Sequence, residues 1–198
     1  MVTATVRLNV DGFKRLRARA PQAIVRATNR AAVSARAAMV PLMARDLGIK
    51  QGALVSGFST TYPGLKLRNA TLALMIARLA APLRRIPLIH FGAKGPEPSR
   101  GKGSGVTYRL GGSRGQARSG FIATMRSGHR GVFVRGGKSR VTTRTRTVAR
   151  RPRLPIRELF GPSLGRVFLK YRPQGRMAAL TSLVKNIQSE FKYALSRS

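Results

Sequence analysis

Apolar and polar residues alternate along the first ten positions of the chain, with Ala4, Val6, Leu8 and Val10 on one side. An alternation of period two predicts a half-buried strand over residues 3–10. The pattern then changes to a helical period, which predicts a short helix over 13–20 and a longer helix that begins near Pro21. Proline suits the first turn of a helix, because the amide hydrogen that it lacks has no partner there.

Alanines recur at helical spacing in the longer helix, and Ala27, Ala31 and Ala38 belong to this stripe. Small side chains let another element approach closely, so we expect the helix to pack tightly on a sheet or on a neighbouring subunit. An ordinary core face is the simpler of these two interpretations. Pro41 is expected to kink the helix, because its ring removes a hydrogen-bond donor and crowds the preceding turn. Gly48 is expected to end it.

The middle of the chain contains two apolar runs followed by a long polar stretch. Residues 71–79 are apolar on both faces, which favours a central strand, although a short helix would show the same run. A second strand is predicted over 84–91, where Pro87 requires an edge position or a bulge. Residues 92–120 are rich in Gly, Ser and basic residues, which is typical of a long flexible loop, and only 106–108 resembles a strand.

The second half of the chain begins with a hairpin pattern over 121–135, where alternating apolar residues flank a polar turn. A basic connector follows over 136–153. A short strand is then predicted over 154–160, and residues 161–163 are expected to turn the chain into a helix.

The C-terminal segment has the clearest helical period, because apolar residues recur at spacings of three and four over 177–195. The opposite face is polar, so an amphipathic helix is predicted. Members of the apolar stripe include Leu180, Val184, Ile187 and Phe191. We interpret the stripe as core packing against the sheet, with a subunit interface as the alternative.

These elements predict an α+β fold, in which an antiparallel sheet is flanked by the Ala-rich N-terminal helix and the amphipathic C-terminal helix. The chain has 198 residues, which suits one domain over residues 1–198 with long basic loops at 92–120 and 136–153. Hydrophobic residues make up 42% of the sequence, and a domain of this length buries roughly 70% of the surface that its unfolded chain exposes. A packed core is therefore expected.

The charge of the chain is extreme, with 39 Lys and Arg against 5 Asp and Glu and a net charge of +34. Like charges on a small domain repel one another and destabilise its compact state. A polyanion would neutralise them, and nucleic acid is the usual partner, followed by anionic membranes. An Arg-biased genome would explain the preference for Arg over Lys, but it would not explain why carboxylates are so scarce.

Several classes of site are excluded or disfavoured by composition. The chain has no Cys, so it forms neither disulfides nor thiolate metal sites. Its N-terminus lacks the pattern of a secretory signal, and its most apolar run is shorter than the roughly 20 residues that span a bilayer. A C-terminal helix lying on a membrane is disfavoured by Glu190 and by the few basic residues there. We expect a soluble, intracellular protein with no membrane partner.

We predict no catalytic site, no metal site and no cofactor. Acid–base catalysis needs positioned titratable groups, and the two histidines, His90 and His129, are interpreted as structural. The carboxylates are far apart in sequence, although the fold could bring two together: Asp11, Asp46, Glu97, Glu158 and Glu190.

The chemistry that the residues do support is contact with phosphates. Basic side chains in Gly-rich segments reach a nucleic-acid backbone without reading its sequence, so non-specific binding of nucleic acid is expected. Contact with acidic partner proteins, or simple solvation, is the alternative. The residues predicted to face phosphates are Lys94, Arg100, Lys102, Arg109, Arg114, Arg118, Arg126 and Arg130.

Two runs in this order of elements are similar to a known family. The Ala- and Arg-rich run from Pro21 to Ala32, and the strand that leads to a proline from Leu154 to Ser163, precede the C-terminal helix. In these features the chain resembles the minor tail protein Z family of lambda-like phages, which are tail-completion proteins. Neither run carries a catalytic or ligand-binding residue, so no functional residue transfers.

The resemblance implies a structural virion protein at the neck or upper tail of a long-tailed phage, present in the host cytoplasm during assembly. Such a protein completes the tail and helps join it to the DNA-filled head, as a ring of six copies around the DNA channel. The partners implied are tail terminator and head-completion or connector proteins, and double-stranded DNA bound without sequence specificity. The alternative is a non-specific nucleic-acid-binding protein of ribosomal or nucleoid type.

Overall fold

The computed structural model of the chain describes residues 10–97, 105–136 and 155–196. Its helices are α1 (Val10–Leu47), α2 (Gln51–Ser56), the 3-10 helix η1 (Leu88–Phe91) and α3 (Leu164–Ser196). Its strands are β1 (Lys66–Arg68), β2 (Arg78–Ala80), β3 (Arg85–Pro87), β4 (Val106–Leu110), β5 (Ser113–Ala117), β6 (Gly120–Thr124), β7 (Arg130–Arg135), β8 (Ile156–Glu158) and β9 (Phe160–Ser163). The α+β class is confirmed.

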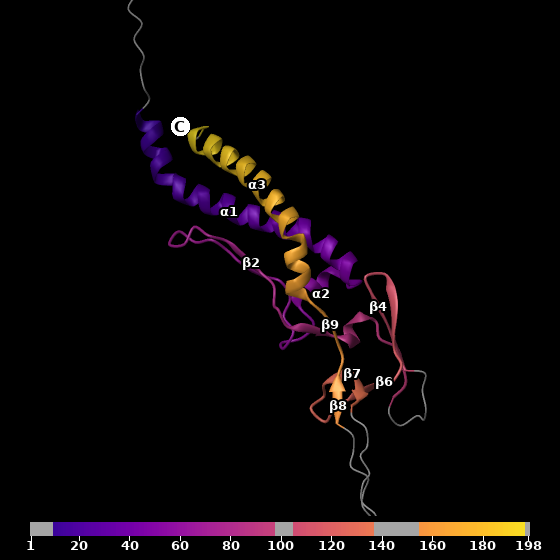
Figure 1. The fold of residues 1–198 in the computed structure, drawn as a ribbon. Helices are drawn as coiled ribbons and strands as arrows, with labels where there is room; N and C mark the ends of the chain where they lie inside the picture. The colour runs from indigo at the N-terminus through magenta and orange to yellow at the C-terminus, as the bar shows by residue number, and fades with distance from the viewer. Residues whose placement is uncertain (1–9, 98–104, 137–154, 197–198) are drawn as a thin grey trace, which may run out of the picture.

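The two long helices cross and form an elongated body, and most strands gather at one end of it (Figure 1). Within the described ranges the strands make four small antiparallel sheets: β1–β2, β3–β9, β4–β5 and β6–β7–β8. The expected single sheet is therefore divided into small units. The core lies where the helices meet these sheets, and its largest fully buried side chains include Met39, Met43, Leu47, Leu54, Phe91, Val106, Val132 and Leu164.

The N-terminal helix differs from the prediction in two ways. Residues 3–9 of the predicted strand lie outside the described residues, while Val10 and the predicted short helix belong to α1, which continues through Pro21 and Pro41. Each proline removes only one backbone hydrogen bond, and packing along the rest of a long helix outweighs that loss. The predicted end is confirmed, since α1 stops at Leu47 and Gly48 follows.

The Ala-rich face of α1 packs mainly against α3, and not against a sheet as expected. Ala27 and Ala31 are buried and Ala38 is half-buried. The predicted C-terminal helix is confirmed but begins earlier, at Leu164, because the expected turn over 161–163 is part of strand β9. Ser163 follows the pattern of a helix cap, since its Oγ accepts a hydrogen bond from the Arg166 amide at 3.2 Å.

The apolar stripe predicted on α3 is only partly turned toward the molecule. Ile187 and Phe191 are half-buried, whereas Leu180 and Val184 are exposed. The prediction that Leu180 and Val184 pack in the core of their own chain is therefore wrong. The face of α3 that packs against α1 therefore differs from the predicted apolar stripe. It includes polar residues, since Ser182 Oγ lies 2.9 Å from Ser34 Oγ.

The hairpin predicted over 121–135 is confirmed by the pairing of β6 with β7, in which Phe121 lies opposite Phe133. Strand β8 adds to the other edge of β7 and places Glu158 opposite Phe133. The strand predicted over 154–160 is divided, because β9 leaves this sheet and pairs with β3. The strand predicted over 84–91 ends at Pro87, after which the chain forms η1. The connector predicted over 136–153 lies outside the described residues except for Gly136.

The prediction of a long loop over 92–120 is wrong for residues 106–117, which form the β4–β5 hairpin. Gly111 and Gly112 connect these strands with φ angles of +54° and +88°. A two-residue turn with positive φ at both positions matches the twist of an antiparallel pair and strongly favours glycine. The turn residues thus create a hairpin in a segment whose composition is typical of a loop.

The central strand predicted over 71–79 is also wrong. Only Arg78 and Leu79 of this run belong to a strand, the short β2, which pairs with β1. Residues 69–77 connect the two strands and are here called the arm (Figure 1). Every residue from Thr71 to Ile76 is exposed, so an apolar run that would suit the interior of a sheet lies on the surface.

Candidate nucleic-acid interface

One face of the β4–β5 hairpin gathers three of the predicted phosphate-facing residues. Arg109 on β4 lies directly opposite Arg114 on β5. Lys94 pairs with Thr107 on the other edge of β4, since each of these residues donates its amide to the carbonyl of the other at 2.8 Å. Side chains directly opposite each other share a face, as do side chains two positions apart. Lys94, Arg109 and Arg114 therefore emerge on the same side.

These cations border a groove of about 290 Å³, which Gly92, Thr107 and Tyr108 complete. All three charged side chains are exposed. Like charges directly opposite each other in a sheet are destabilising, so the Arg109–Arg114 pair favours any anion that binds between them. Guanidinium groups bind phosphate oxygens through paired hydrogen bonds, which makes a phosphate of a nucleic-acid backbone a suitable ligand for this groove.

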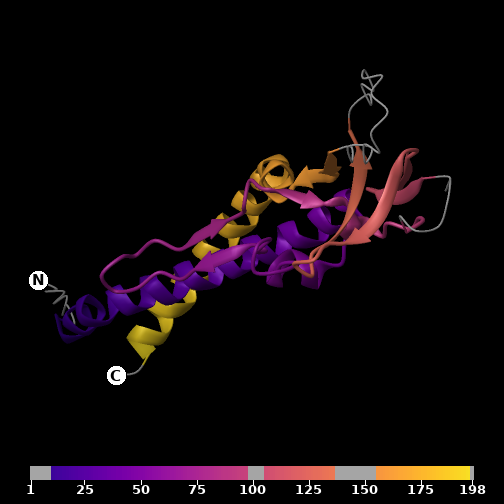
Figure 2. The ribbon, with the colours of Figure 1, turned by 90° about the horizontal axis from the view of Figure 1, so that it is seen from below.

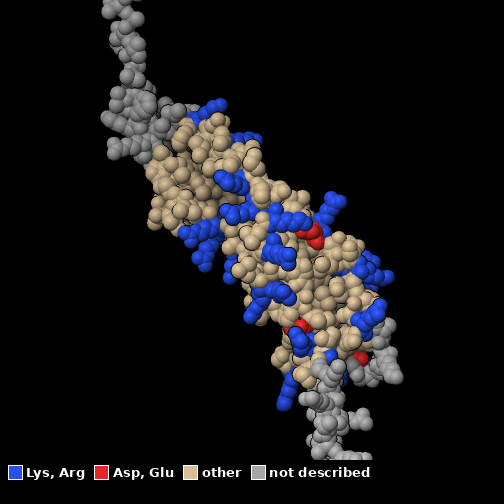
Figure 3. Space-filling model, viewed as in Figure 1, with Lys and Arg blue, Asp and Glu red and all other residues tan. Residues whose placement is uncertain are grey.

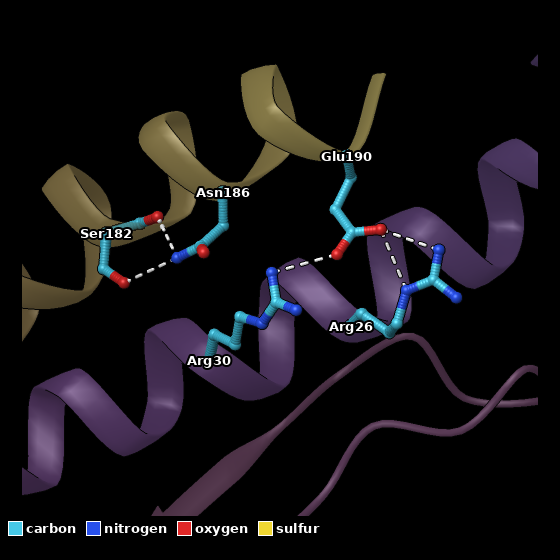
Figure 4. A network of polar contacts seen from close by, with 5 residues as sticks. All are labelled: Arg26, Arg30, Ser182, Asn186 and Glu190. Carbon is cyan, nitrogen blue, oxygen red and sulfur yellow. Dashed lines mark hydrogen bonds and ion pairs between the residues drawn. The ribbon is translucent and has the colours of Figure 1, made fainter. Parts of the chain in front are cut away.

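Two carboxylates form ion pairs away from the groove. Glu190 Oε2 of α3 accepts a hydrogen bond from Arg26 Nε of α1 at 2.9 Å and lies 2.7 Å from Arg26 Nη2, and Glu190 Oε1 lies 2.9 Å from Arg30 Nη1 (Figure 4). Asp46 pairs with Lys170 at 2.9 Å, which raises the pKa of Lys170 chiefly through the hydrogen bond. Among the described residues, no carboxylate forms an ion pair with the groove cations. Their charge is therefore left for an external anion.

The face of the molecule shown in Figure 3 has the same excess of cations over carboxylates. Lys and Arg side chains are spread along the face shown in Figure 3, including the region of β4, and only a few Asp and Glu side chains interrupt them. Lys94, Arg109 and Arg114 are thus part of a wider positive surface. Such a surface attracts a polyanion over a distance, and a groove within it gives the anion a defined position.

The other predicted phosphate-facing residues do not join the groove. Arg118 lies in the turn after β5, and Arg126 and Arg130 lie at the β6–β7 turn. All three side chains are exposed. Arg100 and Lys102 lie outside the described residues. Of the predicted residues that the structure describes, three therefore border the groove on β4–β5, two lie at the β6–β7 turn, and Arg118 belongs to neither group.

The β6–β7 turn borders a second hollow that the sequence did not predict. It measures about 580 Å³ and brings together both histidines, His90 and His129, with Glu158, Tyr62 and Arg130. His129 Nε2 lies 2.8 Å from Glu158 Oε1, so the carboxylate orients the imidazole. His90 and His129, which are interpreted from the sequence as structural residues, thus line one pocket.

Aromatic rings support both imidazoles of this pocket. The His90 ring lies 4.6 Å from the Phe58 ring, and Phe133 contacts His129 edge to face. Burial lowers the pKa of His90, and the nearby His129 lowers it further. Burial also raises the pKa of Tyr62, with Glu158 adding to the effect. Among the described residues, no group of three or more His, Asp and Glu side chains is arranged to hold a metal ion.

No sequence signal could have joined these pocket residues, because they come from four separate segments of the chain. The sequence gives a clearer signal for the groove, because its three cations belong to the predicted set of phosphate-facing residues. Only the strand register shows that they share a face.

The chain has no match among protein-family models, curated proteins or solved structures. None of the helices described is long and apolar enough to cross a membrane.

Proposed function

We propose that this chain is a structural, non-enzymatic protein that holds a nucleic-acid backbone at its strand-rich end. The observation that carries the proposal is the groove in which Lys94, Arg109 and Arg114 meet without a carboxylate partner among the described residues. Contacts of this kind neutralise phosphates and release counterions, and they carry no base sequence information. Within this proposal the ligand is double-stranded DNA, bound without sequence preference.

We place this activity in the neck or upper tail of a long-tailed phage, as a tail-completion protein in a ring of six copies around the DNA channel. Three features support this setting: the similarity of two sequence runs to minor tail protein Z, the net charge of +34, and the exposed apolar surfaces on the arm and α3. A ring around a duplex would give each copy a shared polyanion. The other partners would be tail terminator and head-completion or connector proteins.

The experiment is deletion of the gene from the phage, followed by electron microscopy of the particles. We expect filled heads and tails to accumulate separately, and the purified protein to co-sediment with the isolated tails and restore joining. Normal particles from the deleted phage would contradict the neck assignment.

The same groove also favours the second candidate, a free nucleic-acid-binding protein of ribosomal or nucleoid type. That candidate predicts that the protein sediments with cellular nucleic acid and is missing from virions. Fractionation of infected cells, with the protein detected in each fraction, separates the two candidates.

A further inference from the structure

The arm and α3 present two apolar surfaces that no part of the described chain covers. On the arm, four large side chains are 41–56% exposed: Leu72, Leu74, Met75 and Ile76. On α3, three more are 47–64% exposed: Met177, Leu180 and Val184. Their spacings of three and four residues place the second set on one side of the helix, and we call it the α3 stripe.

The arm is held in position by specific contacts. The side chain of Asn29 on α1 binds the backbone of Ala70 twice, by accepting from its amide at 2.6 Å and donating to its carbonyl at 3.2 Å. At the tip, the Thr71 amide donates to the Leu74 carbonyl at 2.8 Å. The apolar side chains are thus displayed by an ordered hairpin, which lowers the entropic cost of binding a partner.

The two surfaces point in different directions. Helix α1 lies between the arm and the C-terminal half of α3 in both views (Figures 1 and 2), and the α3 stripe is on the side of α3 that α1 does not cover. One copy cannot join the two surfaces to each other. Two different patches on opposite sides of a subunit allow head-to-tail association, which closes into a ring when the rotation between copies permits it.

The distribution of charge indicates what covers these surfaces. Residues 69–77 and 177–184 contain no charged residue, and charges resume at Arg68 and Arg78 on either side of the arm. Two copies that each carry +34 repel each other least where their contacting surfaces are free of charge. An acidic partner would instead be matched by cations within the contact. The charge pattern therefore favours a second copy of this chain.

The area of one contact is small. A fully exposed large aliphatic side chain presents on the order of 100 Å² of apolar surface, so the seven half-exposed side chains of one arm and one α3 stripe would together bury roughly 350 Å². A standard interface buries roughly 1,600 Å² over both partners, of which a little more than half is apolar. A single arm–stripe contact is therefore weaker than a standard interface, and a closed ring, in which each copy uses both surfaces, would stabilise it.

We infer that the arm of one copy packs on the α3 stripe of the next copy, in a head-to-tail assembly. This inference rests on the proposed function, because it supplies the contact between neighbouring subunits of the proposed ring. It also explains why the run from Thr71 to Ile76 is apolar although every residue in it is exposed. The neighbouring copy would cover these side chains.

The test uses the full chain and the mass of its assemblies, measured by sedimentation velocity. Leu74→Asp blocks the arm, Leu180→Asp blocks the α3 stripe, and Val55→Asp changes the charge equally at an exposed valine of α2 outside both surfaces. We expect each of the first two to weaken self-association by roughly 30-fold or more, and Val55→Asp to leave the wild-type assembly intact.

A mixture of the two blocked proteins distinguishes the geometry. Each retains the surface that the other lacks, so the mixture should form discrete 1:1 dimers that do not grow. Because the chain has no cysteine, a variant with Met75→Cys and Leu180→Cys should form disulfide-linked multimers on oxidation, whereas either single variant should not. Cross-linking of the Met75→Cys variant alone would show arm meeting arm and would overturn the inference.

The remaining outcomes are equally decisive. A monomeric wild-type protein, or an assembly unaffected by Leu74→Asp and Leu180→Asp, overturns the inference. So does binding of the arm to anionic phospholipid vesicles without self-association. The monomeric variants retain the groove. If they bind duplex DNA, the arm contact can fail while the proposed function stands. Assembly without any DNA binding would sink the proposed function and leave the arm contact standing.

Discussion

Carboxylates are so scarce in this chain that the position of each one matters. Glu190 shows this most clearly, because its side chain is only 8% exposed and contacts both Arg26 and Arg30 across the α1–α3 interface. A buried carboxylate would be costly without such partners. Here it joins the distal parts of the two helices, where the packed side chains are mostly small.

Replacing Glu190 with Gln removes the charge and keeps the shape. We expect the free energy of unfolding to fall by about 1–3 kcal/mol, the range for lost hydrogen bonds to charged groups. The value stays below that for fully buried pairs because the side chains of Arg26 and Arg30 are 49% and 55% exposed. Chemical denaturation measures the change.

The matched control is Glu97→Gln, which alters the net charge equally at an exposed residue. It should change stability by less than about 0.5 kcal/mol. Equal effects of the two substitutions would show that Glu190 acts only through the overall charge of the molecule.

Individual elements show how far the sequence could lead. The 121–135 hairpin was predictable because its alternation and its turn agree. The β4–β5 hairpin is not predicted because Gly-rich composition is typical of a loop, although the Gly111–Gly112 pair is a hairpin signal.

The prediction of a central strand over the arm is wrong for a different physical reason. A pattern shows that residues 71–79 require burial, but it does not show whether the partner belongs to the same chain.

The crossing of α1 and α3 depends on a glycine. A Cβ atom at Gly175 would overlap the Sδ atom of Met39, which is itself buried in the core. Gly175→Ala should therefore lower the free energy of unfolding by about 1–3 kcal/mol through overpacking, despite the higher helix propensity of alanine. Thermal and chemical denaturation measure the loss.

The control for this substitution is Gly52→Ala in α2, where an added Cβ atom meets nothing within 4 Å. Alanine there should stabilise the protein by up to about 1 kcal/mol through helix propensity. If Gly175→Ala were stabilising as well, close packing at the helix crossing would be refuted.

The whole molecule combines a rod of two helices with a strand-rich end, and Lys and Arg side chains are spread over both (Figures 1 and 3). The two regions suit different tasks. The arm and the α3 stripe are free of charge and suited to contacts between copies, while the groove on β4–β5 is free of carboxylates and suited to phosphates. A ring built through the first would present several copies of the second to one duplex.

The most direct measurement is the salt dependence of duplex DNA binding, followed by fluorescence anisotropy on two unrelated sequences. A variant with Lys94→Gln, Arg109→Gln and Arg114→Gln loses three phosphate contacts per copy. The plot of log affinity against log salt should then be shallower by about 2.7, at about 0.9 for each contact. The control replaces three exposed cations of α3 with Gln, namely Arg172, Lys185 and Lys192, and should keep the wild-type slope. A groove variant with an unchanged slope, or a control that flattens the slope equally, would contradict phosphate binding in the groove.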